Sequence, residues 1–247
     1  MIPIRDTIPS TRFPAVTISL ICVNAIVFLV ELNLSARDLE TLFLHWGIVP
    51  LRFTHPRLDA NYLTLFSSIF LHGGWMHVIG NMWSLWIFGD NVEDCIGRMG
   101  FLTFYILSGL AAYILSGLAA GIGHVVTNPV SPVPTVGASG AIAGVMGAYL
   151  LLFPHARVVT LIPIFIFFQL VEVPAVIFLG IWFVIQLFSG TASLANASAN
   201  AGGVAWWAHI GGFIVGVLWT LPLRHRNRSL LSERQQRYYR YDDDDHW

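Results

Sequence analysis

Residues 137–148 read Gly-Ala-Ser-Gly-Ala-Ile-Ala-Gly-Val-Met-Gly-Ala, and the interpretation of the whole chain depends on this stretch. It places one hydroxyl, that of Ser139, at the head of an apolar run lined with glycine and alanine. Small residues at four-residue spacing commonly mark the contact between two membrane helices, so helix packing is the simplest interpretation. A catalytic interpretation requires polar partners at the same depth on other segments.

The composition is that of an integral membrane protein. Of the 247 residues, 55% are hydrophobic and 11% are charged, and the mean hydropathy is +0.67. A soluble domain carries roughly 25% charged residues. The net charge of -1 gives no indication of a nucleic-acid partner. Cys22 lies within the first apolar run and Cys95 in a short turn expected on the cytoplasmic side, so neither a disulfide nor a cysteine metal site is expected.

The apolar residues predict an all-α membrane protein, a bundle of six transmembrane helices with a long interfacial first loop. Each apolar run is long enough to cross a bilayer core of about 30 Å. The loop mixes charged residues with clumped apolar ones, which is typical of segments that lie among lipid headgroups. The expected spans are residues 16–30, 74–88, 101–122, 137–154, 174–188 and 204–221, and the loop covers residues 32–70.

The arginines decide the number of spans, because the apolar tract at residues 158–190 could be counted as one span or two. With six spans, the side that holds both termini carries ten arginines and the other side three, as the positive-inside rule requires. A seventh span would place the six C-terminal arginines outside. We therefore expect residues 158–173 to form a shallow or re-entrant inner segment. Residues 15–222 are the expected membrane domain, between cytoplasmic ends at 1–14 and 223–247.

Unusual polar residues lie near the outer ends of three expected spans. His77 and Asn81 are four residues apart and share one face of the second span. Ser139 begins the fourth span, and His209 lies near the start of the sixth. Polar groups are costly in hydrocarbon and are expected to face one another or a water-filled cavity. The common depth of these four side chains therefore predicts a functional site.

The chemistry available to this set is nucleophilic. A serine hydroxyl needs a base within hydrogen-bond reach, and a neutral imidazole such as that of His209 can serve. The N-terminus of the helix at Ser139 would supply unpaired N–H groups for an oxyanion, and His77 and Asn81 could add side-chain donors. No carboxylate is expected at this depth, so a Ser-His dyad is predicted rather than a triad.

Three motifs on spans two, four and six together resemble the rhomboid family of intramembrane serine proteases: His72-x4-His77-x3-Asn81, Gly137-Ala138-Ser139-Gly140 and Ala208-His209-x2-Gly212-x3-Gly216. The resemblance implies that Ser139 is the nucleophile and His209 the general base. It further implies an oxyanion or substrate-binding site at His77, Asn81 and Gly137, completed by the Ser139 backbone N–H. No metal or other cofactor is implied. The implied partners are membrane-anchored protein substrates, which would enter beside the fifth span under a cap at residues 191–203.

Two alternatives come from other classes of protein. A non-catalytic rhomboid-like scaffold would bind membrane proteins without cutting them, but such a scaffold would be expected to lack the nucleophile or the base. A metalloprotease or metal transporter could use His72, His77 and His209 as ligands, although the spacing of the first two spreads them around a helix. The compact chain without a transit peptide favours a bacterial inner membrane.

Overall fold

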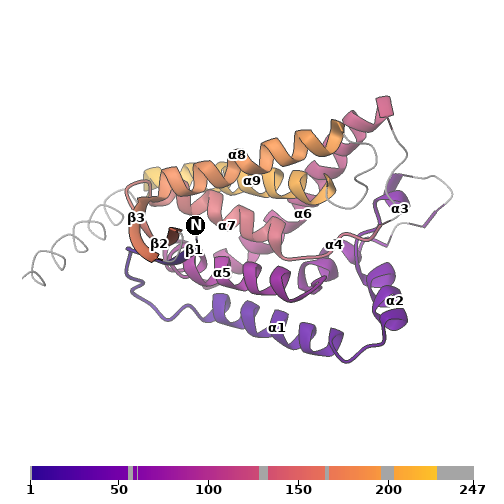
Figure 1. The fold of residues 1–247 in the computed structure, drawn as a ribbon, viewed down its shortest axis with the longest axis horizontal. Coiled ribbons are helices and arrows are strands. Elements are labelled where there is room, and N and C mark those ends of the chain that lie inside the picture. Colours follow the sequence, from indigo (N-terminus) through magenta and orange to yellow (C-terminus); the bar gives the residue numbers. More distant parts are fainter. Residues whose placement is uncertain are drawn as a thin grey trace, which may run out of the picture.

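The computed structural model describes residues 2–54, 58–59, 61–127, 133–164, 167–195 and 203–226. In this part of the chain the protein is mostly helical, with a small sheet at one end of the long helices and short helices at the other (Figure 1). The elements in order are β1 (Ile2–Asp6), α1 (Ala15–Glu31), α2 (Ala36–Trp46), α3 (Pro50–Thr54), α4 (Thr64–Ser67), the 3-10 helix η1 (Ser68–Phe70), α5 (Trp75–Ile96), α6 (Arg98–Thr127), α7 (Ser139–Leu152), β2 (Arg157–Ile164), β3 (Phe167–Pro174), α8 (Ala175–Ala195) and α9 (Gly203–Arg226).

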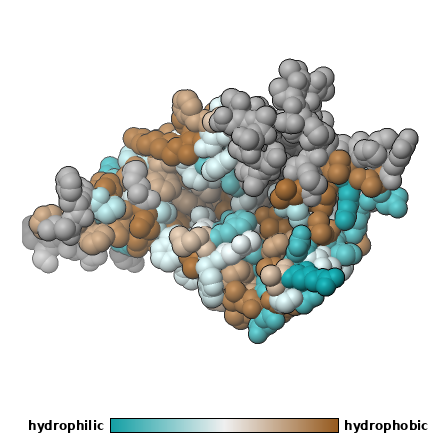
Figure 2. Space-filling model, turned by 45° about the vertical axis from the view of Figure 1, so that its right-hand side comes forward, coloured by the Kyte–Doolittle hydropathy of each residue, from teal (hydrophilic) through white to brown (hydrophobic). Residues whose placement is uncertain are grey.

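Each of the six expected spans coincides with a long helix, namely α1 and α5 to α9. Among the described residues, two helices are long and apolar enough to cross a membrane by themselves, over Ala175–Ala192 and Trp206–Leu223. Shorter apolar helices cover Ala15–Glu31, Arg98–Ile114 and Ser139–Leu152. Hydrophobic side chains also reach the surface over several elements (Figure 2). The crossing of a membrane by all six helices stays a prediction.

Helix α7 is the centre of the structure and packs most extensively against α9. It is buried continuously from Gly140 to Tyr149. A Cβ at Gly212 would overlap the backbone of Gly140, and one at Gly216 would overlap the backbone of Gly144. The two pairs have the same sequence offset, so α7 and α9 run in the same direction, as expected for spans four and six. Only glycine permits this approach of the two backbones.

The expectation of an all-α fold is wrong at residues 157–164 and 167–174, which form two β-strands; the expected shallow or re-entrant position of this segment stays a prediction. Strands β2 and β3 pair antiparallel, with Val159 opposite Glu172, and β1 adds to the free edge of β2. The Val-Val-Thr run at residues 158–160 favours a strand because β-branched side chains pack well on a pleated surface. A short apolar run cannot be assigned to helix or strand by periodicity alone, which explains the error.

The short turn expected at Cys95 is also wrong, because α5 continues to Ile96 and carries Glu93 and Asp94 in its last turns. Both residues are buried, and both bind the chain around the start of α1. Glu93 accepts hydrogen bonds from the backbone N–H groups of Val16 and Thr17, at 3.0 and 2.7 Å. Its carboxylate thus caps the N-terminus of α1, a position that favours negative charge.

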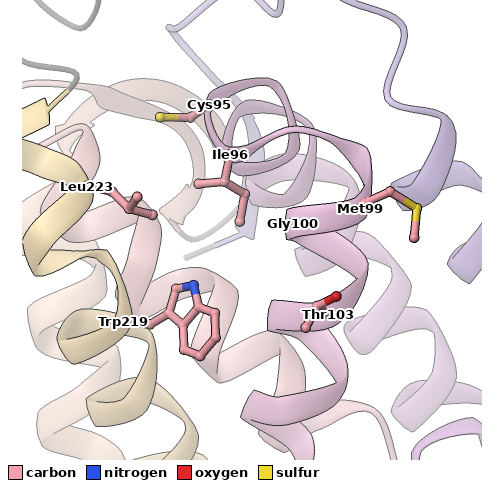
Figure 3. A pocket seen from close by; sticks show the side chains of 7 residues that line it. All are labelled: Cys95, Ile96, Met99, Gly100, Thr103, Trp219 and Leu223. Carbon is pink, nitrogen blue, oxygen red and sulfur yellow. The ribbon is translucent and has the colours of Figure 1, made fainter.

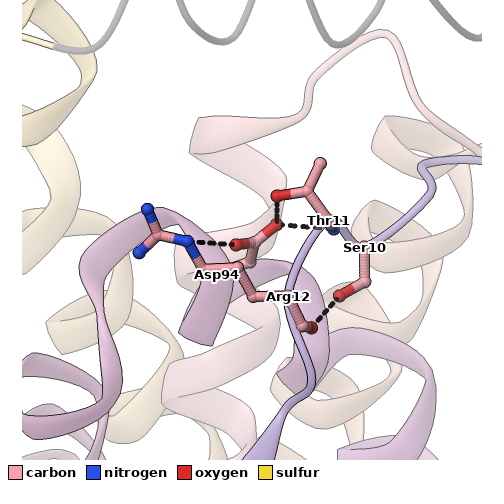
Figure 4. A network of polar contacts seen from close by, with 4 residues as sticks. All are labelled: Ser10, Thr11, Arg12 and Asp94. Carbon is pink, nitrogen blue, oxygen red and sulfur yellow. Dashed lines mark hydrogen bonds and ion pairs between the residues drawn. The ribbon is translucent and has the colours of Figure 1, made fainter.

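Asp94 binds the segment that precedes α1 (Figure 4). Its carboxylate accepts hydrogen bonds from both the backbone N–H and the hydroxyl of Thr11, at 2.8 and 2.7 Å. Arg12 lies at 3.9 Å from the same carboxylate. Satisfying a buried charge in this way removes most of the cost of burying it. The acidic end of α5 therefore fixes the start of the chain to the helix bundle.

The first loop forms the short helices α2 to α4 and η1. The span expected to end at residue 122 continues as helix, because α6 extends to Thr127. The expected external cap is helical up to Ala195, and its remainder at residues 196–202 lies outside the described residues. The same holds for the polar tail from residue 227 onward.

Strand β1 ends in an acidic residue held between two helices. The Asp6 carboxylate accepts hydrogen bonds from Tyr149 Oη at 2.5 Å and from Asn91 Nδ2 at 2.8 Å. Burial is the main cause that raises the pKa of Asp6, to about 8, and the nearby Asp90 raises it further. The folded protein therefore binds a proton here over a pH range in which the unfolded chain has released it.

This proton makes stability depend on pH. Because the pKa of Asp6 rises from 3.8 to about 8 on folding, the free energy of unfolding should fall as the pH increases through that interval. We expect a lower melting temperature in detergent at pH 8 than at pH 5.5, and a smaller difference in Asp6→Asn, which keeps an oxygen acceptor. Asp38→Asn, at an exposed position on α2, is the control and should retain the full difference. An Asp6→Asn protein with an unchanged pH dependence would contradict this account.

Candidate functional site

Helix α5 directs His77 and Asn81 at the glycine that precedes the nucleophile candidate. Both side chains lie on one face of α5, as their spacing predicts. A Cβ built on Gly137 would lie 2.6 Å from His77 Nε2 and 3.7 Å from Asn81 Nδ2. His77 Nδ1 accepts a long hydrogen bond of 3.4 Å from the Gly73 N–H, which leaves the proton on Nε2. His77 therefore presents an N–H donor to this loop.

The peptide at Gly137 is held from two sides. Its N–H donates to the carbonyl oxygen of Ser68, and its carbonyl accepts a hydrogen bond from Tyr113 Oη, both at 2.9 Å. Its φ of +129° lies in the region that favours glycine. Two residues earlier, Thr135 exchanges backbone hydrogen bonds with Ile48 of the first loop. The loop before α7 is thus anchored to η1, α6 and the first loop.

Ser139 is the first residue of α7 and is half-buried. In the described part of the chain, no side chain caps this helix N-terminus. The N–H groups of the first turn have no partner within the helix, and they carry the positive end of its dipole. A developing negative charge next to Ser139 would therefore meet unpaired donors.

The glycine contact between α7 and α9 brings Ser139 and His209 to the same level. A Cβ on Gly140 would lie 3.7 Å from the carbonyl oxygen of Ala208 and 3.9 Å from its Cβ, and Gly212 contacts the same glycine one turn further on. Ser139 precedes Gly140 and His209 follows Ala208, so the two candidates occupy matching positions on parallel helices. Within the described residues no hydrogen bond joins their side chains.

The imidazole of His209 is surrounded by groups from two other helices and its own. Its Nδ1 lies 2.8 Å from Oε1 of Gln186 on α8. The ring centroids of Trp182 and Trp206 lie 5.9 and 6.0 Å from that of His209. His77 is close enough that positive charges on both histidines would repel each other. The structure therefore brings together candidate residues from α5, α7 and α9.

His72 lies beside the site without joining it. Its ring is 5.1 Å from that of His77, and it is almost fully buried. Burial lowers the pKa of His72 to about 4, and the proximity of His77 adds to this effect. The described residues include no group of three His, Cys, Asp or Glu side chains placed to hold one metal ion. The metal-binding alternative therefore gains no support from the structure.

A large cavity of about 570 Å³ lies away from this site, near the ends of α5 and α9 and the start of α6 (Figure 3). Its lining is largely apolar and comprises Cys95, Ile96, Met99, Gly100, Thr103, Trp219 and Leu223. The candidate side chains instead lie near the beginnings of α5, α7 and α9. The cavity thus belongs to the opposite end of the bundle.

The parallel, glycine-packed pair α7 and α9, with His77 and Asn81 of α5 against the loop before Ser139, defines a helical protein with a candidate functional site. The rhomboid-domain family model matches residues 59–226. The match covers more than half of the chain, so the protein belongs to the rhomboid family of membrane proteins.

Several curated proteins are similar to this chain. The mitochondrial Rhomboid protein 1 of Saccharomyces cerevisiae is 29% identical over 191 residues, which cover 73% of this chain and 47% of that protein. The Rhomboid protease GluP of Bacillus subtilis is 31% identical over 123 residues, which cover 50% of this chain and 21% of that protein. The human mitochondrial Presenilin-associated rhomboid-like protein is 27% identical over 168 residues, which cover 64% of this chain and 37% of that protein.

The chain matches less than half the length of each of these relatives. Two of them carry mitochondrial names, which does not fit the expectation of a bacterial inner membrane. The relatives therefore support a membrane protein of the rhomboid family without assigning its membrane.

Sequence reasoning missed two polar side chains of this region, Tyr113 and Gln186. Each lies in an apolar helix, where a polar residue is a signal in itself. A single tyrosine in an apolar helix is a weak signal, and its contact with Gly137 appears only in the folded chain. The dyad is predicted from the lack of a carboxylate partner for His209, whereas the partner in the structure is the Gln186 amide.

The space at Gly137 gives a testable prediction. Gly137→Ala should lower the free energy of unfolding by roughly 1 to 3 kcal/mol, because the new methyl group meets His77 Nε2 and the backbone is strained for any L side chain. Thermal unfolding in detergent measures the effect. Gly80→Ala, on α5 where no atom lies within 4 Å of the new Cβ, is the matched control and should be neutral or slightly stabilising. Equal melting temperatures for the two variants would refute the packing described here.

Proposed function

We propose that the protein is an intramembrane serine endopeptidase that cleaves the transmembrane or juxtamembrane segment of membrane-anchored proteins. The observation that carries this proposal is the matching level of Ser139 and His209 on two helices in backbone contact. The placement of His77 and Asn81 against the loop before Ser139 supports it independently.

In the proposed mechanism, Ser139 Oγ attacks the carbonyl carbon of the scissile peptide bond while His209 Nε2 takes the hydroxyl proton. The resulting imidazolium then donates this proton to the leaving amine, and water releases the acyl group in a second step. The oxyanion would be stabilised by the Ser139 N–H, by His77 Nε2–H and by Asn81 Nδ2. Asn81 Nδ2 is buried and has no hydrogen-bond partner among the described residues, so it is available for such a contact.

Gly137 contributes to this site through its lack of a side chain. Its N–H already donates to Ser68, so we assign it no hydrogen bond to the oxyanion. The absence of a Cβ lets the His77 ring and the Asn81 amide approach the loop beside Ser139. A substrate strand would then lie between these donors and the hydroxyl.

The length of α7 supports cleavage inside the membrane. Its 14 residues span about 21 Å, which is less than a bilayer core of about 30 Å. With six crossings, both termini lie on the arginine-rich side, and α7 would begin below the opposite surface. Ser139 would therefore meet its substrate within the membrane. No metal or other cofactor takes part.

The nucleophile is tested by Ser139→Ala. We expect cleavage of a single-span model substrate in liposomes to fall at least about 100-fold, because loss of a triad-type residue or oxyanion donor costs that much or more. Gel-based detection of the cleavage product measures the rate.

The matched control is Ser19→Ala, which removes an exposed hydroxyl on α1 that bonds to its own helix. This variant should cleave at the rate of the unmodified protein. Undiminished cleavage by Ser139→Ala would rule out the assigned nucleophile. A purified, folded protein that cleaves no membrane-anchored substrate would favour the non-catalytic scaffold.

A further inference from the structure

We propose that Gln186 of α8 is the positioning residue that holds His209 as the general base, an inference that rests on the proposed function. The pair joins two helices, and its contact distance of 2.8 Å between Gln186 Oε1 and His209 Nδ1 is that of a good hydrogen bond. Gln186 does not touch the reacting atoms. It acts through the histidine.

The orientation of the Gln186 amide follows from its two partners. Its Nε2 donates a hydrogen bond of 3.1 Å to the carbonyl oxygen of Trp182, one turn earlier on α8. A carbonyl oxygen can only accept, so the nitrogen of the amide must face Trp182 and the oxygen must face His209. Its own helix thus determines which atom Gln186 offers to the histidine.

This orientation selects the tautomer of His209. The amide oxygen can only accept, so His209 Nδ1 must carry the hydrogen and donate it. In a neutral imidazole the other nitrogen, Nε2, then has a free lone pair. That nitrogen is the one that can take a proton from Ser139 Oγ. The opposite tautomer would present an N–H to the serine and could not act as a base.

The burial of Gln186 indicates a specific role. Its neighbours on α8 are exposed, Ile185 by 51% and Leu187 by 37%, whereas Gln186 is only 4% exposed. A buried amide in an apolar helix is costly unless its hydrogen bonds are made. Both of its polar atoms are paired here, one within α8 and one to the candidate base. The amide therefore does for His209 what the carboxylate does in a triad, without adding charge.

No other described group around His209 accepts a hydrogen bond from Nδ1 and so fixes its tautomer. The ring centroids of Trp182 and Trp206 lie 5.9 and 6.0 Å from that of His209. These rings restrict the orientation of the imidazole but do not determine which of its nitrogens carries the hydrogen. The titratable side chain that acts on His209 from α5 is His77, and it faces the loop at Gly137. Neither α7 nor the described part of α9 places a carboxylate against the ring.

The test compares three variants at one position in the full-length protein in liposomes. Gln186→Leu removes the acceptor at similar size and should lower kcat about 10- to 100-fold with KM changed by less than about 3-fold. Gln186→Glu keeps an oxygen acceptor and should restore most of kcat. Its carboxylate also stabilises the imidazolium, so the acidic limb of the pH–rate profile should move up by about one unit. Gln186→Asn cannot reach the ring and should resemble Gln186→Leu.

Gln169→Leu is the matched control, because Gln169 is an exposed glutamine on β3. It should leave kcat and the pH profile unchanged. Melting temperatures of all variants separate folding defects from catalytic ones, and Gln186→Glu remains informative if Gln186→Leu does not fold.

Two results distinguish this inference from the proposed function. If the unmodified protein cleaves, Ser139→Ala does not, and Gln186→Leu cleaves with unchanged kcat, the positioning role is wrong and the protease assignment stands. The positioning role is also wrong if Gln186→Glu is folded, as inactive as Gln186→Leu, and unshifted in pH dependence. If the unmodified protein cleaves no substrate, both proposals fail.

Discussion

The close approach of α7 and α9 is the constraint on which the rest of the structure depends. Gly140 and Gly144 on one helix meet Gly212 and Gly216 on the other at backbone contact. A Cβ at Gly212 or Gly216 would overlap the backbone of α7, and one at Gly140 or Gly144 would meet side chains of α6. Packed backbones leave little room to relax, so a side chain at any of these positions would push the helices apart. The same contact sets Ser139 level with His209. Stability and the geometry of the candidate dyad therefore come from one interface, and substitutions here would affect both.

The polar residues at one end of the bundle make structural contacts, and those at the other end form the candidate site. At one end, Glu93 binds the first turn of α1, Asp94 binds the segment before it, and β1 pairs with β2. These contacts fix the helices relative to one another. At the other end, polar groups such as Asn81 Nδ2 are left without partners among the described residues. Buried polar groups in a native protein are usually paired, so such an exception indicates a function.

The sequence predicted the positions of the long helices well, because helices depend on local signals. The candidate site residues were selected by a signal of the same local kind. Long apolar runs mark helices, and His77, Asn81, Ser139 and His209 stand out as polar residues within them. Strands β2 and β3 could not be predicted in this way, since β2 is stabilised by pairing with β1 at the other end of the sequence. The pairing of Gln186 with His209 depends on the rotation of α8 against α9, which no local pattern records.

The most direct test of the central claim is the site of covalent labelling by a fluorophosphonate, located by mass spectrometry of the treated protein in detergent. An activated serine reacts with such a probe, whereas an ordinary serine in a helix contact does not. The dyad predicts an adduct on Ser139 in the unmodified protein and none in a folded His209→Ala variant. An adduct on another residue, or labelling of Ser139 that persists without His209, would contradict the account.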